Sequence, residues 1–146
     1  MIEGFNTVDV ARFAEATSMR PTWRGRPGHH YLYVGQFIPR KNVDGLVRAF
    51  GAARQPHDTL TLVGEGPEEG QLRNLASDLS LETAITFAGS LNGDDLVMAY
   101  ASANTLVLPS KEEVWGLVVN EGLAAGLQVV VSTLAVWLRP FRACPV

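Results

Sequence analysis

The sequence predicts an α/β protein with a doubly wound, Rossmann-like parallel sheet, and three observations support this prediction. Five apolar runs of four or five residues alternate with four segments of helical periodicity. The runs are apolar almost throughout, which is typical of strands buried on both faces. Glycine or proline follows the first four runs. Strands that alternate with helices in this way pair in parallel, and right-handed crossovers place helices on both faces of the sheet.

The first strand and helix follow a segment without regular structure. Residues 1–28 have no sustained period and contain prolines and glycines near their end, which predicts a loop or interdomain linker. Residues 30–34 are aromatic and β-branched and predict a buried strand. Residues 42–53 carry apolar side chains at helical spacing, with Asn42 as the expected cap.

The second strand and helix are separated by a glycine-rich turn. Residues 59–63 predict the strand, and Pro67 suits the first turn of a helix because its φ angle is already fixed. Glu68 and Glu69 favour the positive end of that helix. The apolar side chains expected on one helical face are Leu72, Leu75, Ala76 and Leu79.

The second half of the chain repeats the alternation. Residues 84–87 predict a strand that Gly89 closes, and a turn at residues 92–94 caps the next helix. Residues 105–108 predict a fourth strand, residues 116–126 a helix, and residues 128–132 a fifth strand. Ligands bind such sheets at the carboxyl ends of the strands, close to the point where the strand order reverses. The loops after Val34, Val63, Phe87 and Leu108 are therefore the place to look for a site.

Composition limits the classes of protein. The 146 residues are enough for one domain with a core, and 47% of them are hydrophobic, which excludes a disordered tail. No apolar run approaches the roughly 20 residues of a membrane-spanning helix. The formal charge of −3 argues against binding of nucleic acid. The single cysteine, Cys144, excludes a disulfide framework. Together these limits predict a soluble, cytoplasmic domain.

The turn at residues 64–70 invites comparison with a dinucleotide fingerprint. Gly64, Gly66 and Gly70 have the wrong spacing, because the third glycine falls one place late. The two glutamates that precede Gly70 would also repel a pyrophosphate. A tight turn whose glycines adopt unusual backbone angles explains the pattern better, and a nucleotide lying close by is compatible with such a turn.

A basic pair precedes the first helix. Arg40 and Lys41 lie just before residue 42, where the amides of a helix N-terminus attract anions and a lysine adds a full charge. A solvated pair in a surface loop is the competing interpretation. Lys41 is one of only two lysines in the chain, beside ten arginines, which favours a functional role.

Residues 109–121 contain three glutamates, and two of them, Glu113 and Glu121, flank a helix start with seven residues between them. Glu113 follows a strand, and Glu121 lies eight positions later on the expected helix. Carboxylates there can accept hydrogen bonds from sugar hydroxyls, while the first amides of the helix receive phosphate. Solvated loop and helix charges are the competing interpretation. The amides in question belong to Gly116, Leu117 and Val118.

The remaining reactive side chains suggest no catalytic or metal site. His29, His30 and His57 are not spaced as metal ligands and are expected in ordinary loop or strand-edge roles. Cys144 has no environment that would activate a nucleophile.

Taken together, these segments resemble the C-terminal, donor-binding half of a retaining glycosyltransferase of family 4, the group 1 type, with a GT-B fold. The resemblance covers roughly residues 4–133. Its most specific part is the glutamate pair, Glu113 and Glu121, with seven residues between them. The other matching segments are residues 6–9 with Phe13, residues 34–41, residues 63–67, residues 87–89 and residues 109–110.

The resemblance implies a nucleotide-diphosphate sugar, of uridine or guanosine, as donor substrate, without a metal or other cofactor. Glu113 would contact the sugar hydroxyls, Glu121 the ribose hydroxyls, and Lys41 the diphosphate. Glu113 and Lys41 are the implied catalytic residues. The implied donor-binding set is Gly35, Gln36, Lys41, Gly64, Gly66, Phe87, Gly89, Glu113, Trp115, Gly116, Leu117, Val118 and Glu121.

The chain departs from the family pattern at three places. Gln36 stands where many members have a phosphate-binding arginine, and Gly122 and Leu127-Gln128 replace other expected residues. The resemblance stops after residue 133. Residues 134–146 lack the expected glycine-rich turn, and their tryptophan, arginine, proline and cysteine content suggests a frame-shifted or artificially terminated end.

The expected domains are a linker remnant (residues 1–28), a nucleotide-sugar-binding domain (residues 29–133) and an atypical tail (residues 134–146). The leading function is the donor half of a hexosyltransferase that builds a bacterial polysaccharide or glycolipid, located in the cytoplasm or peripherally at the inner membrane. Because the acceptor-binding N-terminal domain is missing, we expect the chain alone to be inactive. The alternatives are a non-catalytic nucleotide-binding or structural module, and an epimerase or dehydrogenase half, which the glycine spacing disfavours.

Overall fold

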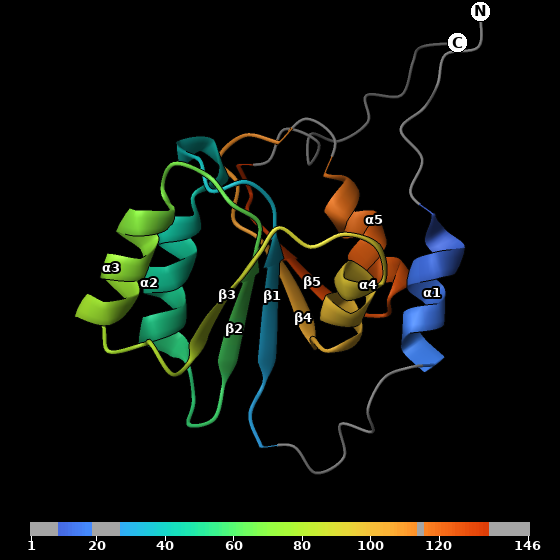
Figure 1. The fold of residues 1–146 in the computed structure, drawn as a ribbon, viewed down its shortest axis with the longest axis horizontal. Coiled ribbons are helices and arrows are strands. Elements are labelled where there is room, and N and C mark those ends of the chain that lie inside the picture. Colours follow the sequence, from blue (N-terminus) through green and yellow to red (C-terminus); the bar gives the residue numbers. More distant parts are fainter. Residues whose placement is uncertain (1–8, 19–26, 114–115, 135–146) are drawn as a thin grey trace, which may run out of the picture.

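The five predicted strands form one parallel sheet. Figure 1 shows the computed structural model, which describes residues 9–18, 27–113 and 116–134. The strand order is β3-β2-β1-β4-β5, and all pairings are parallel, as expected of a doubly wound sheet. The strands are β1 (His30–Val34), β2 (Thr59–Val63), β3 (Ile85–Gly89), β4 (Thr105–Leu108) and β5 (Gln128–Val131).

Helices cover both faces of the sheet. In Figure 1, α2 and α3 lie on one side, and α1, α4 and α5 lie on the other. None of the helices in the described ranges is long and apolar enough to cross a membrane. The helices are α1 (Val10–Ser18), α2 (Val43–Ala53), α3 (Glu69–Asp78), α4 (Gly93–Ala101) and α5 (Leu117–Ala124), and a short 3-10 turn, η1 (Pro39–Lys41), precedes α2.

The core consists of two apolar layers, one on each side of the sheet. Successive side chains of a strand point to opposite faces, so neighbouring residues of β1 divide between the layers. Tyr33 packs with Phe37 and Leu62 beneath α2 and α3, whereas Leu32 packs with Tyr100 and other side chains beneath α4 and α5. Both faces of β1 are therefore buried, as its apolar sequence predicts.

The prediction of an irregular linker over residues 1–28 is wrong in part, because Val10–Ser18 forms α1. Phe13 of this helix is only 7% exposed and packs edge-on against Tyr100, with ring centroids 5.1 Å apart. Arg12 forms an ion pair of 2.8 Å with Asp94 of α4. A nine-residue helix anchored by one buried ring leaves too short a periodic signal to detect in the sequence.

Two smaller predictions also need correction. Asn42 occupies the N-cap position of α2, but its side chain donates to the carbonyl oxygen of Pro109 at 3.2 Å and makes no capping hydrogen bond. Leu79 lies beyond the last residue of α3 and is 41% exposed, so the buried face of that helix ends at Ala76. Of the predicted tail, only Leu134 is described, and it is exposed.

Candidate functional site

The strand order reverses between β1 and β4. The chain runs outward from β1 through β2 to β3, and then returns to the other side of β1 to form β4 and β5. The loops that leave β1 and β4 at their carboxyl ends therefore start next to each other and lead to helices on opposite faces of the sheet. Doubly wound sheets bind ligands at such a point. Lys41 ends η1 in the first of these loops, and Glu113 lies in the second.

Lys41 and Glu113 form a largely buried ion pair at this point. The Nζ atom of Lys41 donates to Oε2 of Glu113 at 2.6 Å, and the two side chains are 15% and 10% exposed. The hydroxyl of Ser110 donates to the same carboxylate oxygen at 3.2 Å. The structure thus brings together the two implied catalytic residues, which are 72 positions apart in the chain.

Glu113 is held in its charged form. Burial by itself would raise the pKa of this carboxyl, but the hydrogen bond and charge of Lys41 outweigh it. Ser110 and the backbone N–H of Gly116 add further hydrogen bonds, and the pKa falls below its ordinary value. An ammonium group has three N–H donors, and Glu113 occupies one of those of Lys41. The pair therefore combines a fixed carboxylate with a cation that can donate further.

The glycines after β2 allow two loops to touch. A Cβ atom on Gly64 would lie 1.9 Å from the carbonyl oxygen of Gly35, and one on Gly66 would lie 2.5 Å from that of Phe37. Two backbone hydrogen bonds of 2.9 Å join the same loops. The N–H of Gly35 donates to the carbonyl oxygen of Val63, and the N–H of Phe37 donates to that of Glu65. The tight turn expected from the sequence is present, and what approaches its glycines is the backbone of the neighbouring loop.

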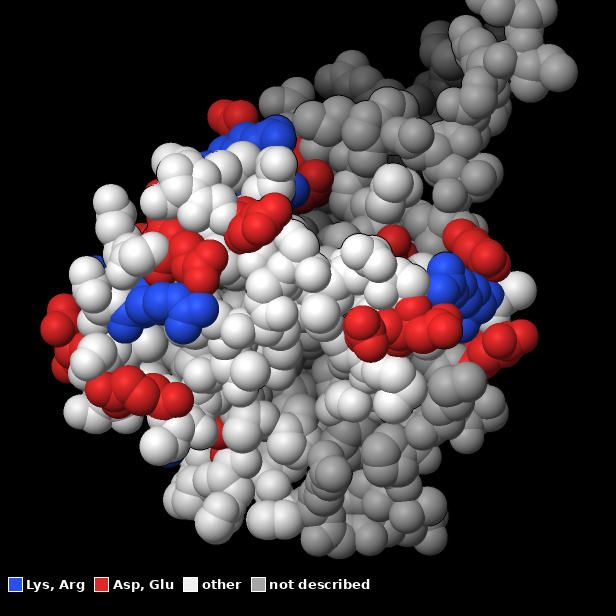
Figure 2. Space-filling view, viewed as in Figure 1, with Lys and Arg blue, Asp and Glu red and all other residues white. Residues whose placement is uncertain are grey.

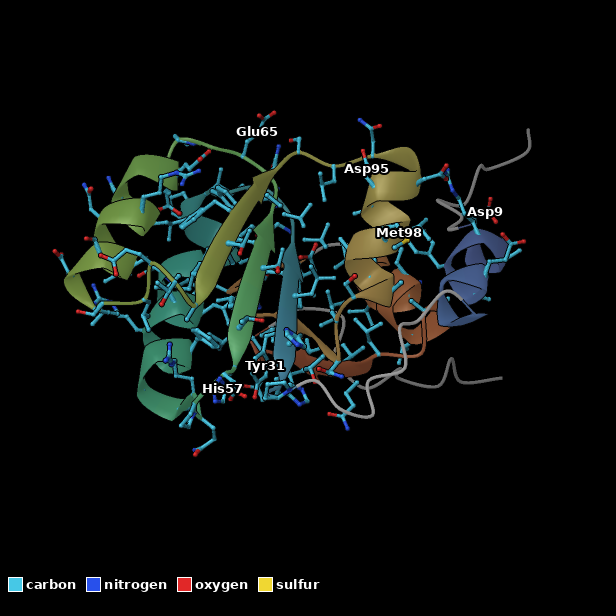
Figure 3. All side chains as sticks on the ribbon, turned by 60° about the horizontal axis from the view of Figure 1, so that its bottom comes forward. Asp9, Tyr31, His57, Glu65, Asp95 and Met98 are labelled. Atoms are coloured by element: carbon cyan, nitrogen blue, oxygen red, sulfur yellow. The ribbon has the colours of Figure 1, made fainter. Side chains whose placement is uncertain are left out.

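An open hollow of about 290 Å³ lies at the carboxyl ends of β1, β2 and β3. It contains Gly35, Gln36 and Gly64 of the predicted set, together with Glu65, which lies at this end of the sheet in Figure 3. On the face seen in Figure 2, charged side chains gather over the flanking helices and the surface between them is largely uncharged. The hollow is lined by Val34, Gly35, Gln36, Val63, Gly64, Glu65, Ser90 and Leu91.

In the loop after β3, the residues that line the hollow are not the ones named from the sequence, Phe87 and Gly89. The ring of Phe87 packs against Phe37 on the α2 and α3 side, and the guanidinium of Arg73 lies 4.3 Å above it. The residues that line the hollow are instead Ser90 and Leu91. Their position directly after Gly89, at a strand end, was the available sequence signal. Gly89 itself adopts a φ of +70°, which turns the chain at this point.

The start of α5 supplies amides and the second carboxylate. Gly116 is the N-cap with a φ of +55°, and its N–H bonds to Glu113, so Leu117 and Val118 provide the first-turn amides. Glu121 lies one turn further, and its Oε2 accepts a hydrogen bond of 2.5 Å from the hydroxyl of Tyr100. Tyr100 was not predicted as a site residue. Trp115, which was, lies outside the described residues.

Gly122, one of the departures from the family pattern, has a packing reason. A Cβ atom at this position would lie 2.7 Å from Cδ2 of Leu106, a fully buried side chain of β4. Glycine therefore lets α5 lie closer to the sheet than alanine would, without displacing Leu106. Gln36, another departure, is exposed at the hollow, and its carbonyl oxygen accepts from the hydroxyl of Tyr33 at 2.9 Å.

The histidines belong to the opposite edge of the sheet. A ring nitrogen of His29 pairs with the hydroxyl of Thr105 at 2.8 Å, and one of His30 pairs with that of Thr59 at 2.5 Å. Within the described ranges, no three histidine, cysteine, aspartate or glutamate side chains gather in a way that could hold a metal ion.

Comparison with known proteins gives consistent matches. The sequence model of the family described as "Glycosyl transferases group 1" matches residues 26–136. An uncharacterised glycosyltransferase of Methanocaldococcus jannaschii is 36% identical over 104 residues, which are 70% of this chain and 27% of that protein. A GDP-mannose-dependent alpha-mannosyltransferase of Mycobacterium tuberculosis is 34% identical over 128 residues, covering 84% of this chain and 31% of that protein. The chain thus spans less than a third of the length of either relative.

The fold also matches solved glycosyltransferase structures with the GT-B fold. The C-terminal domain of a group 1 family glycosyl transferase from Francisella tularensis superposes with a TM-score of 0.73. The match covers 91% of this chain and 74% of that domain at 19% identity, so it speaks for the fold alone.

Proposed function

We propose that this chain, which belongs to the group 1 family of glycosyl transferases, binds the nucleotide-sugar donor of a retaining hexosyl transfer at the carboxyl edge of its sheet. Membership of this family excludes the epimerase or dehydrogenase interpretation of the same sheet. The observation that carries the proposal is the buried pair of Lys41 and Glu113 at the strand-order reversal.

The pair suits a diphosphate that carries a sugar. Lys41 would neutralise the diphosphate, and the amides of Leu117 and Val118 at the start of α5 would add hydrogen bonds and a favourable dipole. Glu113, kept ionised, would accept hydrogen bonds from the sugar hydroxyls. The glycine-walled hollow at the carboxyl ends of β1, β2 and β3 is the place we assign to the nucleoside. Glu121, in the middle of α5, is assigned to the ribose hydroxyls.

The proposed transfer reaction builds up negative charge on the departing diphosphate. The bond between sugar C1 and the diphosphate oxygen breaks, and the acceptor hydroxyl oxygen forms a new bond to C1 on the same face of the ring. The acceptor proton passes to the departing diphosphate. Negative charge grows on that leaving group, so Lys41 and the helix amides stabilise the transition state more than the ground state. In this scheme the cationic side chain takes the place of a metal ion, and no other cofactor is required.

Calorimetric titration with uridine- and guanosine-diphosphate sugars tests the proposal. One of the two donors is expected to bind, and Glu121→Ala is expected to weaken that binding by at least about 10-fold, because a charged hydrogen-bond acceptor is lost. Asn120→Ala is the matched control, since Asn120 is the exposed preceding residue of the same helix. Absence of binding to either donor by the folded chain refutes the proposal. Equal binding by both variants removes Glu121 from the site.

Transfer by the whole protein is a further part of the proposal. The chain covers less than a third of the length of the two relatives described above. We therefore propose that these residues hold the donor and that a glycan or glycolipid acceptor is bound elsewhere in the complete enzyme. A cytoplasmic location, where nucleotide sugars are made, belongs to the same proposal.

A non-catalytic nucleotide-binding module is the second candidate, and two observations favour it. Gln36 supplies no charge at a position where many members of the resembled family have an arginine, and the charge of Lys41 is already neutralised by Glu113. Such a module would bind the free nucleoside diphosphate as tightly as the nucleotide sugar, because the sugar would add no contacts. A donor at least about 10-fold tighter than its nucleoside diphosphate would favour the transferase instead.

A further inference from the structure

Tyr100 and Glu121 form a partly buried hydrogen bond that the mechanism above does not use. Tyr100 lies near the end of α4, is fully buried, and donates its hydroxyl to Oε2 of Glu121 at 2.5 Å. The two residues belong to different helices, 21 positions apart in the chain. A tyrosine in an apolar core needs one partner for its hydroxyl. Here that partner is the carboxylate of Glu121, which we have assigned to the ribose of the donor nucleotide sugar.

The ring of Tyr100 is fixed by its neighbours. Phe13 of α1 packs edge-on against it, with an angle of 76° between the ring planes. The surrounding layer includes Leu32, Val97 and Leu106. Burial, and then the negative charge of Glu121, raise the pKa of Tyr100 well above its ordinary value. The phenol therefore stays protonated, and its hydroxyl remains a donor.

Glu121 is fixed at the other end by its backbone. Gly122 lets α5 lie directly against Leu106 of β4, as described above, so the helix that carries Glu121 has little freedom to rotate. The side chain itself has three torsions, and on a partly exposed helix face they would be free without a partner. The hydrogen bond to Oε2 removes that freedom and leaves Oε1 to accept from a ligand.

We propose that Tyr100 is a positioning residue that orients the Glu121 carboxylate towards the ribose hydroxyls of the bound nucleotide. This inference rests on the proposed function, since it presumes that Glu121 contacts the ribose. It adds a residue on α4, held by α1, to the determinants of donor affinity. A carboxylate whose orientation is fixed before the ligand arrives binds with a smaller loss of conformational entropy.

A purely structural role for the hydroxyl predicts a different result. If the hydrogen bond only satisfies a buried group, its loss destabilises the fold and affects every ligand equally. If it orients Glu121, its loss weakens binding only of ligands that present the ribose hydroxyls. Ligands with and without those hydroxyls therefore separate the two roles within one variant.

The experiment compares the wild-type chain with Tyr100→Phe, which keeps the ring and removes the hydroxyl. Each is titrated calorimetrically with uridine and guanosine diphosphate and with their 2′-deoxy and 3′-deoxy analogues. We expect the wild-type chain to prefer one ribonucleotide over a deoxy analogue by about 10-fold or more. Tyr100→Phe is expected to lose most of that preference, while its affinity for the deoxy analogue stays within about two-fold.

The outcomes separate the two proposals. If the wild-type chain has the preference and Tyr100→Phe retains it, Tyr100 does not position Glu121, and the proposed function survives. If the wild-type chain binds without any preference, the assignment of Glu121 to the ribose fails, and the inference fails with it. If no nucleotide binds at all, the proposed function itself is refuted.

A second measurement covers the case in which Tyr100→Phe does not fold. The chain is labelled with 3-fluorotyrosine, and the fluorine resonance of Tyr100 is identified by elimination with Tyr31→Phe and Tyr33→Phe. A ribonucleotide is expected to shift this resonance because it changes the carboxylate that the hydroxyl contacts, whereas the deoxy analogue is expected to leave it in place. Equal responses to both ligands would overturn the inference.

Discussion

The two edges of the sheet are both rich in polar side chains but use them differently. At the amino edge, the buried carboxylate of Asp58 accepts from the backbone N–H groups of His29 at 2.7 Å and Gln55 at 2.8 Å. Asn104 accepts in the same way from the backbone of His30 at 2.8 Å. These side chains satisfy backbone donors at or just before the starts of β1 and β2.

At the carboxyl edge, the largely buried ammonium of Lys41 is paired with a carboxylate, whereas the side-chain pairs at the amino edge join histidine rings to threonine hydroxyls. Lys41 and Ser110 both donate to Glu113, and the loops are joined by their own backbone hydrogen bonds. Figure 3 shows the two edges, with His57 at one end of the sheet and Glu65 at the other. Lys41, whose partner is a side chain, can exchange that partner for a ligand without releasing a backbone group. We therefore expect the carboxylate of Asp58 at the amino edge to serve the fold and the cation of Lys41 at the carboxyl edge to serve a ligand.

The largest expected effect comes from removing the charge at the carboxyl edge. Lys41→Gln keeps a hydrogen-bond donor for Glu113 but loses the cation, and donor binding is expected to weaken by about 100-fold. Titration calorimetry measures the change. Lys111→Gln is the control, because Lys111 is the other lysine and its side chain is exposed. Unchanged donor affinity in a folded Lys41→Gln chain would make this edge structural as well.

The next effect concerns the amino edge. Asp58→Ala leaves two backbone N–H groups without their acceptor, and the free energy of unfolding is expected to fall by about 2 kcal/mol. Donor affinity is expected to stay within about two-fold, since the residue lies at the far end of the sheet. Urea denaturation and calorimetry on the same preparation measure both quantities. A variant with unchanged stability and much weaker binding would contradict the comparison.

The smallest expected effect is a loss of folding stability at acidic pH, to which carboxylates at both edges contribute. Hydrogen bonds from Gln55 and His29 outweigh burial and lower the pKa of Asp58, and the pKa of Glu113 is lowered by Lys41 against the effect of burial. A lowered folded-state pKa gives stability that is present above the unfolded-state value and lost as the pH falls through the folded-state value. Stability is therefore expected to be level near neutral pH and to decline below the ordinary carboxyl range, near 4.5 for glutamate.

Urea midpoints measured from neutral pH down to about pH 3 test this dependence. Asp58→Asn and Glu113→Gln are each expected to flatten the decline, because each removes one group that binds a proton more readily in the unfolded state. Stability that rises on acidification, or slopes that neither variant changes, would show that these carboxylates are not stabilised by the contacts described.

The sequence predicted the features that depend on neighbouring residues, and it missed those that depend on contacts between residues distant in the chain. The alternation of strands and helices is a local pattern, and it predicted all five strands and α2 to α5 to within a few residues. α1 was missed because one buried ring, Phe13, anchors a nine-residue helix. Asn42 was expected to cap α2, but an acceptor on Pro109, 67 positions away, takes its side chain instead.

For the site, the sequence by itself determined which groups are present: a lysine before α2, two glutamates around the start of α5, and glycines at the strand ends. Only the tertiary structure decided their partners. The order β3-β2-β1-β4-β5 brings Lys41 and Glu113 together, and the placement of α4 and α5 on the same side of the sheet, both against α1, brings Tyr100 to Glu121. Residue types follow from local chemistry, whereas partners distant in the chain follow from which elements pack together, and periodicity carries no information about that choice.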